Sequence, residues 1–225
     1  MGESFLLGKK FQDMLSYVKS KDLKIALNTN GTFLNDGNIN FLIKSGVERI
    51  IVGIDAFKKE TYETIRINGN FEKVKKNTIN FIEEVKKSSS NTQIVVQFIE
   101  MDENKNEENL FIDYWTKMGA KVKIRQKGSW IDCINTNTLN ENKNRKPCPW
   151  LLHTGTILWN GDVTICCIDY DGKYRIGNVK ENNFRKIWLG DLKKLRDIHI
   201  KGDFSNLPKI CKGCKDWQVS NIKII

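Results

Sequence analysis

The fold is decided by a stretch that reads 148-CPWLLHTGTILWNGDVTICC-167 and by a short segment further on, 211-CKGC-214. Four cysteines in these segments have the spacing of a metal site: Cys148, Cys166, Cys211 and Cys214. Where thiols stay reduced, clustered cysteines are more often metal ligands than disulfides. Four thiolates can hold either an iron–sulfur cluster or a tetrahedral zinc ion. The sequence therefore predicts one metal site, and the spacing alone leaves its occupant open.

A hairpin between the first two of these cysteines is predicted to bring them together. Asn160-Gly161 stands between two apolar runs, residues 156–159 and 162–165. Because Asn-Gly tolerates positive φ at both central positions of a turn, it predicts a two-residue type I′ hairpin. That register places Cys166 opposite Gly155, close to Cys148.

Composition and charge bound the classes of function. The chain has 225 residues, of which 40% are hydrophobic, enough for one domain or for one domain with a small appended module. No apolar run approaches the ~20 residues of a membrane span, and residues 1–10 do not form a signal peptide. We therefore expect a cytoplasmic protein without a membrane partner. The net charge is +10, but the lysines are dispersed, so no nucleic-acid partner is predicted.

Residues 1–127 alternate between short apolar strands and amphipathic helices. Strands are predicted at residues 23–27, 49–54, 94–99 and 122–125, and helices at 11–18, 39–43, 58–66, 72–87 and 107–118. Continuous apolar strands between helices are typical of a parallel sheet covered by helices. Ligands bind such sheets at the carboxyl ends of the strands, where Asn30 and Asp55 stand. Residues 128–147 are predicted to be a linker, and residues 148–225 a cysteine-rich module.

Short motifs in both parts resemble those of one enzyme family. The first part contains Gly2-Glu3-Ser4, Leu27-Asn28-Thr29-Asn30-Gly31, and Val52-Gly53-Ile54-Asp55 followed by Ile65-Arg66; the second contains Cys148-x12-Gly161-x4-Cys166 and Cys211-x2-Cys214. The first set resembles the later motifs of the radical SAM partial barrel, and the second resembles the SPASM module that follows it. The resemblance implies an α/β fold: a partial parallel (β/α) barrel of the radical SAM type lacking its first strands, followed by a small SPASM module with a β-hairpin.

The resemblance also implies roles for individual residues. Gly2 and Glu3 would hold the amino group of S-adenosyl-L-methionine (SAM), Asn30 would line its pocket, and Arg66 would pair with its carboxylate. The residues alone allow plainer roles, which are a solvated chain start, a strand-to-helix turn and a solvated helix residue. Asp55 could likewise cap the following helix. In the module, the four cysteines would hold an auxiliary 4Fe–4S cluster, with zinc as the alternative.

Two departures from the family pattern shape the functional prediction. No three of the six cysteines have the Cys-x3-Cys-x2-Cys spacing of the SAM-cleaving cluster, and Gly53 stands where the family has serine. Full-length relatives cleave SAM reductively, and a 5′-deoxyadenosyl radical removes hydrogen from a peptide or small metabolite. We expect this chain, as an N-terminally truncated relative, to be inactive alone and its strand at 23–27 to be an exposed edge. The alternatives are an iron–sulfur electron-transfer partner of a reductant protein or a complete radical SAM enzyme, and a zinc-stabilised interaction module.

The remaining cysteines, histidines and tryptophans are predicted to be structural. Cys167 is expected to be buried and apolar because neighbouring strand residues face opposite sides. Cys133 is expected to be a free thiol in the linker, and His153 and His199 to have structural roles. The tryptophans of the module should form its core: Trp150, Trp159, Trp188 and Trp217.

Overall fold

The computed structural model describes residues 2–130, 134, 139, 144–220 and 223–225. Cys133 and much of the predicted linker lie outside these residues. The chain separates into two compact units, Met1–Arg125 with Ile222–Ile225, and Gln126–Asn221. None of the described helices combines the length and the apolar character that crossing a membrane requires.

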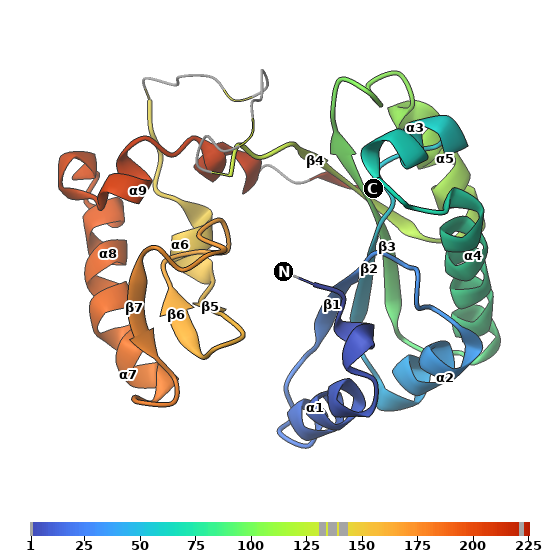
Figure 1. The fold of residues 1–225 in the computed structure, drawn as a ribbon, viewed down its shortest axis with the longest axis horizontal. Coiled ribbons are helices and arrows are strands. Elements are labelled where there is room, and N and C mark those ends of the chain that lie inside the picture. Colours follow the sequence, from blue (N-terminus) through green and yellow to red (C-terminus); the bar gives the residue numbers. More distant parts are fainter. Residues whose placement is uncertain (1, 131–133, 135–138, 140–143, 221–222) are drawn as a thin grey trace. The chain divides into compact units, whose positions relative to one another are not determined.

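The first unit is built on one sheet with the strand order β1-β2-β3-β4-β8 (Figure 1). Its strands are β1 (Ala26–Thr29), β2 (Arg49–Gly53), β3 (Gln93–Glu100), β4 (Lys121–Gln126) and β8 (Lys223–Ile224). β1 pairs with β2 and β2 with β3 in parallel register, which confirms the predicted parallel sheet. The short β8 pairs antiparallel with β4, so the last residues of the chain complete the sheet of the first unit.

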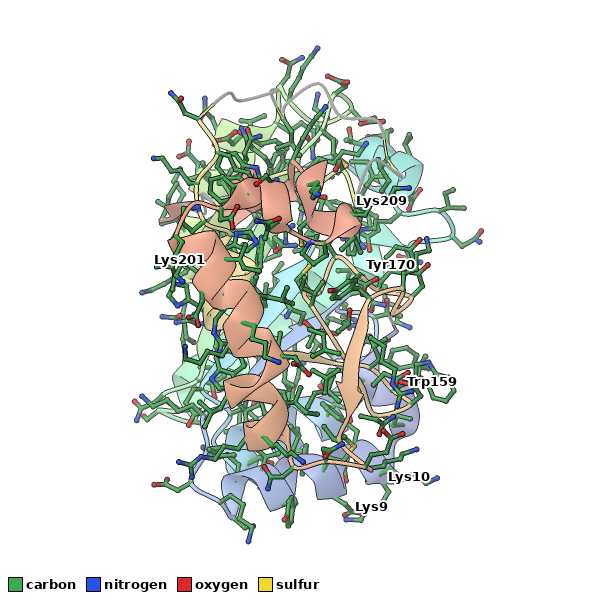
Figure 2. All side chains as sticks on the ribbon, turned by 90° about the vertical axis from the view of Figure 1, so that its left-hand side faces the viewer. Lys9, Lys10, Trp159, Tyr170, Lys201 and Lys209 are labelled. Carbon is green, nitrogen blue, oxygen red and sulfur yellow. The ribbon has the colours of Figure 1, made fainter. Side chains whose placement is uncertain are left out.

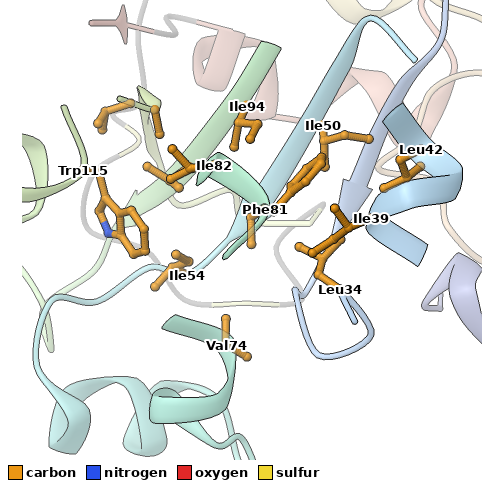
Figure 3. Close-up of a cluster of buried hydrophobic side chains, with 14 of the residues drawn as sticks. Leu34, Ile39, Leu42, Ile50, Ile54, Val74, Phe81, Ile82, Ile94 and Trp115 are labelled. Carbon is orange, nitrogen blue, oxygen red and sulfur yellow. The ribbon is translucent and has the colours of Figure 1, made fainter. Parts of the chain in front are cut away.

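The helices of the first unit fall in the predicted places. They are η1 (Ser4–Leu7), α1 (Lys9–Lys19), α2 (Asp36–Ser45), α3 (Lys59–Ile65), α4 (Phe71–Lys87) and α5 (Glu108–Met118). The side chains of Asn35 and Asn70 cap α2 and α4 by accepting backbone N–H bonds, and Gly46 ends α2 at a φ of 64°. In Figure 3, Ile39 and Phe81 from these helices pack beside Ile50 of β2 in the buried core.

The first strand begins three residues later than predicted. The apolar run 23–27 suggested a strand from its first leucine, but Leu23 is 56% exposed and β1 starts at Ala26. The hydrogen bond from Arg49 N to Ile25 O marks the point where pairing with β2 begins. β1 stands at one end of the strand order of the described residues, which confirms the predicted edge position.

The second unit combines a small antiparallel sheet with short helices. Its strands, in the order β5-β6-β7, are β5 (Thr156–Ile157), β6 (Asp162–Thr164) and β7 (Arg175–Asn178). Its helices are α6 (Pro149–His153), α7 (Phe184–Leu189), α8 (Asp191–Ile200), η2 (Phe204–Asn206), α9 (Lys209–Lys212) and η3 (Asp216–Ser220). A small apolar cluster that includes Leu151, Ile165 and Leu192 joins the sheet to these helices.

The hairpin forms where predicted, but its register is wrong by one residue. Thr156 pairs with Thr164 and Ile157 with Val163, and Leu158 N donates to Asp162 O at 2.8 Å. The loop therefore has three residues and ends at Gly161, which has a φ of 93°. A three-residue loop needs positive φ only at its last position, whereas the predicted type I′ turn needs it at two. Cys166 consequently lies beyond the β5–β6 ladder and not opposite Gly155.

Two predictions of burial in the second unit are also wrong. Trp159 is 98% exposed, because the three-residue loop turns it outward, as its projecting side chain in Figure 2 shows. Cys167 is exposed as well, since β6 ends at Thr164 and the alternation of a strand no longer applies at Cys166 and Cys167. Trp217, in contrast, is buried as expected.

Candidate metal centre and cofactor site

The four cysteines selected from their spacing line a single cavity in the second unit. Cys148, Cys166, Cys211 and Cys214 are all free thiols and partly buried. The remaining wall is made of apolar side chains and of three residues that carry side-chain N–H groups, Arg145, His199 and Trp217. Besides the cysteines, the cavity is lined by Arg145, Leu151, Ile165, His199, Ile210 and Trp217. Thiols from positions 148 to 214 thus converge on one small, mainly apolar space.

Each cysteine is presented by a short local element. Cys148 is the N-cap residue of α6, and Pro149 occupies the first helical position, where its missing N–H is not needed. Cys166 follows the end of β6 in a turn closed by Asp169 N donating to Cys166 O. Cys211 lies on α9, and Cys214 N donates back to Cys211 O at 3.3 Å. The C-x-x-C segment is therefore a compact turn that aims both thiols at the cavity.

Burial keeps the thiols protonated in the absence of a metal. It raises the pKa of Cys166 and Cys211 to about 12 and that of Cys214 to about 11, and it also raises the pKa of Cys148. Backbone N–H groups of Leu151 and Trp150 oppose this effect at Cys148. Since the thiolate is the form that binds metal, occupation of the site must release protons.

Two buried nitrogen atoms at this cavity indicate which kind of group it could hold. His199 is fully buried, and its Nδ1 accepts a hydrogen bond from Cys148 N at 3.2 Å, which leaves the ring proton on Nε2. Burial lowers the pKa of His199 to about 4, so the ring is neutral. Among the described residues, neither His199 Nε2 nor Arg145 Nε has a hydrogen-bond partner. Sulfur atoms of a bound cluster would supply the acceptors that these two donors lack.

The spacing of the ligands bears on the choice between one ion and a cluster. Within the described part of the chain, no three His, Cys, Asp or Glu side chains lie close enough together to hold a single metal ion. A tetrahedral zinc ion bonds its thiolates at about 2.3 Å and so draws them tightly together. An iron–sulfur cluster has several metal atoms and accepts thiolates that stand further apart. Four thiols around a shared cavity therefore fit a cluster better than one ion.

A buried carboxylate next to Cys214 was not foreseen from the sequence. Asp216 is 1% exposed and accepts hydrogen bonds from both Ser129 N and Ser129 Oγ, the latter at 2.9 Å. Asp216 Oδ2 also lies 4.0 Å from Cys214 Sγ. Asp216 thereby ties the segment around residue 129 to the C-x-x-C turn.

In the first unit, Glu3 is bound to the end of β1. Its Oε2 accepts hydrogen bonds from Asn30 N at 2.9 Å and from Thr29 Oγ1 at 3.0 Å. Its Oε1 accepts from Phe5 N, while Gly2 is exposed. The structure therefore brings together Glu3 and Asn30, two of the residues selected for SAM, at the carboxyl end of the first strand.

Arg66 meets Asp55 at the end of the neighbouring strand. The Arg66 Nη2 atom is ion-paired with Asp55 Oδ2, and Asp55 Oδ1 accepts from Ile99 N at 2.9 Å. Asp55 is 2% exposed, and burial raises its carboxyl pKa above the ordinary value, while the charge of Arg66 opposes this rise. Asp55 does not cap α3; the carboxylate of Glu107 accepts from Phe57 N and Lys58 N instead.

Gly53 lies between the Arg66 side chain and the end of β1. A methyl group built at Gly53 would lie 3.1 Å from Arg66 Nη2 and 3.9 Å from Thr29 O. The absence of a side chain therefore gives the guanidinium room beside β2. Glu3, Asn30 and Arg66 come from three separate segments, yet all stand at the carboxyl ends of the adjacent parallel strands β1 and β2. This is the edge at which sheets of this kind bind ligands.

Two family models match the chain. Residues 1–107 match that of the radical SAM superfamily, and residues 148–215 match SPASM, described as an iron–sulfur cluster-binding domain. Curated relatives include the probable GTP 3′,8-cyclases of Methanococcus maripaludis strains, one of which is 32% identical over 120 residues. That match covers 53% of this chain and 38% of the relative, so the chain spans well under half the length of these proteins.

Solved structures with a similar fold cover nearly the whole chain. BtrN in complex with AdoMet and 2-DOIA has a TM-score of 0.56 at 17% identity, covering 95% of this chain and 69% of that one. Streptococcus suis SuiB bound to S-adenosylmethionine has a TM-score of 0.56 at 12% identity, covering 97% and 58%. The anSMEcpe protein with bound AdoMet has a TM-score of 0.53 at 18% identity, covering 97% and 68%. At these identities the likeness concerns the fold alone.

Proposed function

Because the chain belongs to the radical SAM proteins that carry a SPASM domain, we propose that it takes part in SAM-dependent radical chemistry on a small-molecule or peptide substrate. The family prediction made from the motifs is confirmed by both family models. The predicted fold class is confirmed as well: a partial parallel barrel followed by a small antiparallel module. We propose the division into residues 1–127, a linker at 128–147 and the SPASM module at 148–225.

The metal centre carries this proposal. We assign Cys148, Cys166, Cys211 and Cys214 as the ligands of one auxiliary 4Fe–4S cluster, which supplies one-electron chemistry when bound. The support is the shared apolar cavity together with the two buried donors that lack partners among the described residues. The chain's own contribution is to exclude water, to give up thiol protons on binding, and to hold the cluster between α6, β6 and α9.

The SAM site is the second part of the proposal. We assign Gly2, Glu3, Asn30 and Arg66 to it, because Glu3 and Asn30 are hydrogen-bonded and Arg66 reaches the neighbouring strand end. In this arrangement Glu3 would accept from the amino group of SAM. Arg66 would offer its remaining donors to the SAM carboxylate while Asp55 holds the guanidinium in place.

The six cysteines of the sequence include no Cys-x3-Cys-x2-Cys segment. We propose that these 225 residues do not cleave SAM by themselves and that a complete radical SAM enzyme or a reductant protein works with them. The second candidate function is accordingly that of an iron–sulfur electron-transfer partner. It is favoured because the sequence has four thiols for one cluster but no Cys-x3-Cys-x2-Cys motif for the SAM-cleaving cluster.

One experiment separates these statements. The chain is purified and reconstituted anaerobically, its iron and sulfide are measured, and it is reduced in the presence of SAM. We expect about four irons and four sulfides per chain, binding of SAM that weakens in the Glu3→Gln variant, and no 5′-deoxyadenosine. Zinc in place of iron would contradict the cluster assignment, and formation of 5′-deoxyadenosine would contradict the proposed inactivity.

A further inference from the structure

Two polar side chains line the cysteine cavity in addition to the four thiols, and metal ligation by the thiols does not account for them. Arg145 and His199 line the same space as the four cysteines, and each has one buried side-chain nitrogen without a partner among the described residues. Buried N–H groups in native proteins are nearly always hydrogen-bonded, since an unpaired buried donor loses its hydrogen bonds to water without replacing them. Two such atoms at one cavity indicate that their acceptors belong to what the cavity holds.

Arg145 is held in place by a hydrogen bond and by an aromatic contact. Its Nη1 donates to Lys212 O at 2.9 Å, and its guanidinium lies 5.3 Å from the ring centre of Phe204. It is the one Lys or Arg among the described residues that line the cavity. Its charge also lowers the pKa of Cys148, Cys211 and Cys214, in opposition to the effect of burial. The cation is thus electrostatically coupled to three of the four thiols.

His199 is held by its other ring nitrogen. Nδ1 accepts from the backbone of Cys148, and the ring makes an edge contact with Phe204 at 5.9 Å. This fixes the tautomer with the proton on Nε2. A neutral imidazole N–H is a donor without charge, so it can approach a sulfur atom without the desolvation cost of an imidazolium.

We propose that Arg145 and His199 raise the reduction potential of the cluster, Arg145 as its neighbouring positive charge and His199 as an N–H donor to one of its sulfur atoms. This inference rests on the proposed function, since it requires the cluster. When an external one-electron donor reduces the cluster, one negative charge is added, and no bond forms or breaks. A fixed cation and a sulfur-directed donor stabilise that added charge, which makes reduction more favourable.

The test is an equilibrium redox titration of the anaerobically reconstituted full chain, followed by electron paramagnetic resonance. Arg145→Gln removes the charge, and Arg145→Lys keeps it. The matched control is Lys209→Gln, which removes an equal charge from an exposed side chain two residues before Cys211 (Figure 2). At a fixed potential we expect Arg145→Gln to lower the ratio of reduced to oxidised cluster about tenfold, or about 59 mV for one electron. Arg145→Lys should fall between Arg145→Gln and the unchanged protein, and Lys209→Gln should match the unchanged protein.

The contact between His199 and the cluster can be detected without substituting His199. The chain has two histidines, so ¹⁵N-histidine labelling of the His153→Gln variant leaves His199 as the labelled side chain. Electron spin echo modulation of the reduced cluster should show coupling to ¹⁵N. A purely structural histidine would not produce this coupling, so its absence in fully loaded protein would overturn the assignment of His199.

The remaining outcomes separate this inference from the proposed function. Equal potentials for Arg145→Gln and the unchanged protein at equal iron content would overturn the role of Arg145 alone. An equal shift in Lys209→Gln would assign the effect to overall charge and would also overturn it. If Arg145→Gln does not load, Arg145→Met, which removes the same charge, decides, since a potential below that of the unchanged protein is then required. Failure of the unchanged chain to take up iron and sulfide would overturn the proposed function itself.

Discussion

The two units of the chain differ in what stabilises each of them. In the first, the helices and the strands share one large buried apolar cluster, whose members range from Phe5 to Ile124 in the sequence. In the second, the buried cluster of the described residues has six members, and three of the cysteines, Cys148, Cys166 and Cys211, pack against it. Its strands have two to four residues each. We therefore expect the first unit to be stable from burial alone and the second to depend on what its cysteines bind.

This difference indicates that metal binding and folding are coupled in one unit and not in the other. Small domains built around a metal gain on the order of 10 kcal/mol from binding it and unfold when it is removed. The cysteines are contributed by α6, the residues after β6, and the segment that begins with α9, so a bound cluster would link segments that are far apart in the sequence. The first unit has no such dependence, and the two should therefore respond separately to the changes considered next.

The largest effect is expected from removing one cluster ligand. In Cys211→Ser the cluster should be lost, and the second unit should lose its cooperative unfolding while the first keeps its own. Hydrogen exchange read segment by segment, together with iron analysis, measures both results. Cys167→Ser is the matched control, because Cys167 is the exposed neighbour of Cys166. Protection of the second unit that survives in iron-free Cys211→Ser would show that its core suffices.

The next effect concerns the core of the first unit. Trp115 is 2% exposed and contacts the rings of Phe111 and Tyr114. Trp115→Ala should lower the free energy of unfolding of the first unit by about 3–5 kcal/mol, because it removes a large buried side chain and leaves a cavity. Tyr17→Ala, at a residue that is 65% exposed, should change it by less than about 0.5 kcal/mol. Denaturant titration of both variants checks this, and iron content should not change in either.

Sequence reasoning succeeded where the signal was local or periodic. The helices and strands of the first unit follow from the alternation of apolar runs, and the four thiols that share a cavity follow from their spacing. It failed where contacts between distant residues decide. The two-residue β8 pairs with β4 across about a hundred positions, and nothing in Lys223–Ile224 marks it as a strand. The hairpin register was missed because Asn-Gly suits both loop lengths, and the wrong choice also misplaced Trp159.

Polar contacts around the metal centre were missed for the same reason, because they join residues far apart in the sequence. His199 lies 51 positions from the residue whose amide it accepts, and Asp216 lies 87 positions from Ser129. A lone histidine on a helix or an aspartate after a C-x-x-C pair has no spacing that reveals such a contact. The residues proposed for SAM were predicted only in part. The sequence indicated each motif, but the position of Arg66 beside Gly53 depends on how β1 and β2 pair.

A smaller effect is expected from the buried carboxylate of the second unit. Asp216→Ala leaves the backbone N–H of the buried Ser129 without this acceptor, which should destabilise the second unit by about 1–3 kcal/mol. Chemical denaturation of the iron-loaded protein measures this loss. Asp197→Ala is the control, because Asp197 makes a solvent-facing ion pair with Lys193 and should contribute less than about 1 kcal/mol. Equal losses in both variants would show that the link to Ser129 adds no stability beyond that of a surface pair.

The smallest effect is a pH dependence confined to the first unit. Hydrogen bonds from Ile25 N and Lys19 Nζ hold the pKa of Glu48 at about 2, below its ordinary value of 4.5. Because the folded-state pKa is lowered, the stability that Glu48 contributes is present above pH 4.5 and is lost as the pH falls toward 2. Glu48→Gln should therefore flatten the acid limb of the stability profile of the first unit, while Glu83→Gln, at an exposed position, should not. Stability measured between pH 2 and 6 tests this, and identical acid limbs for Glu48→Gln and the unchanged protein would rule it out.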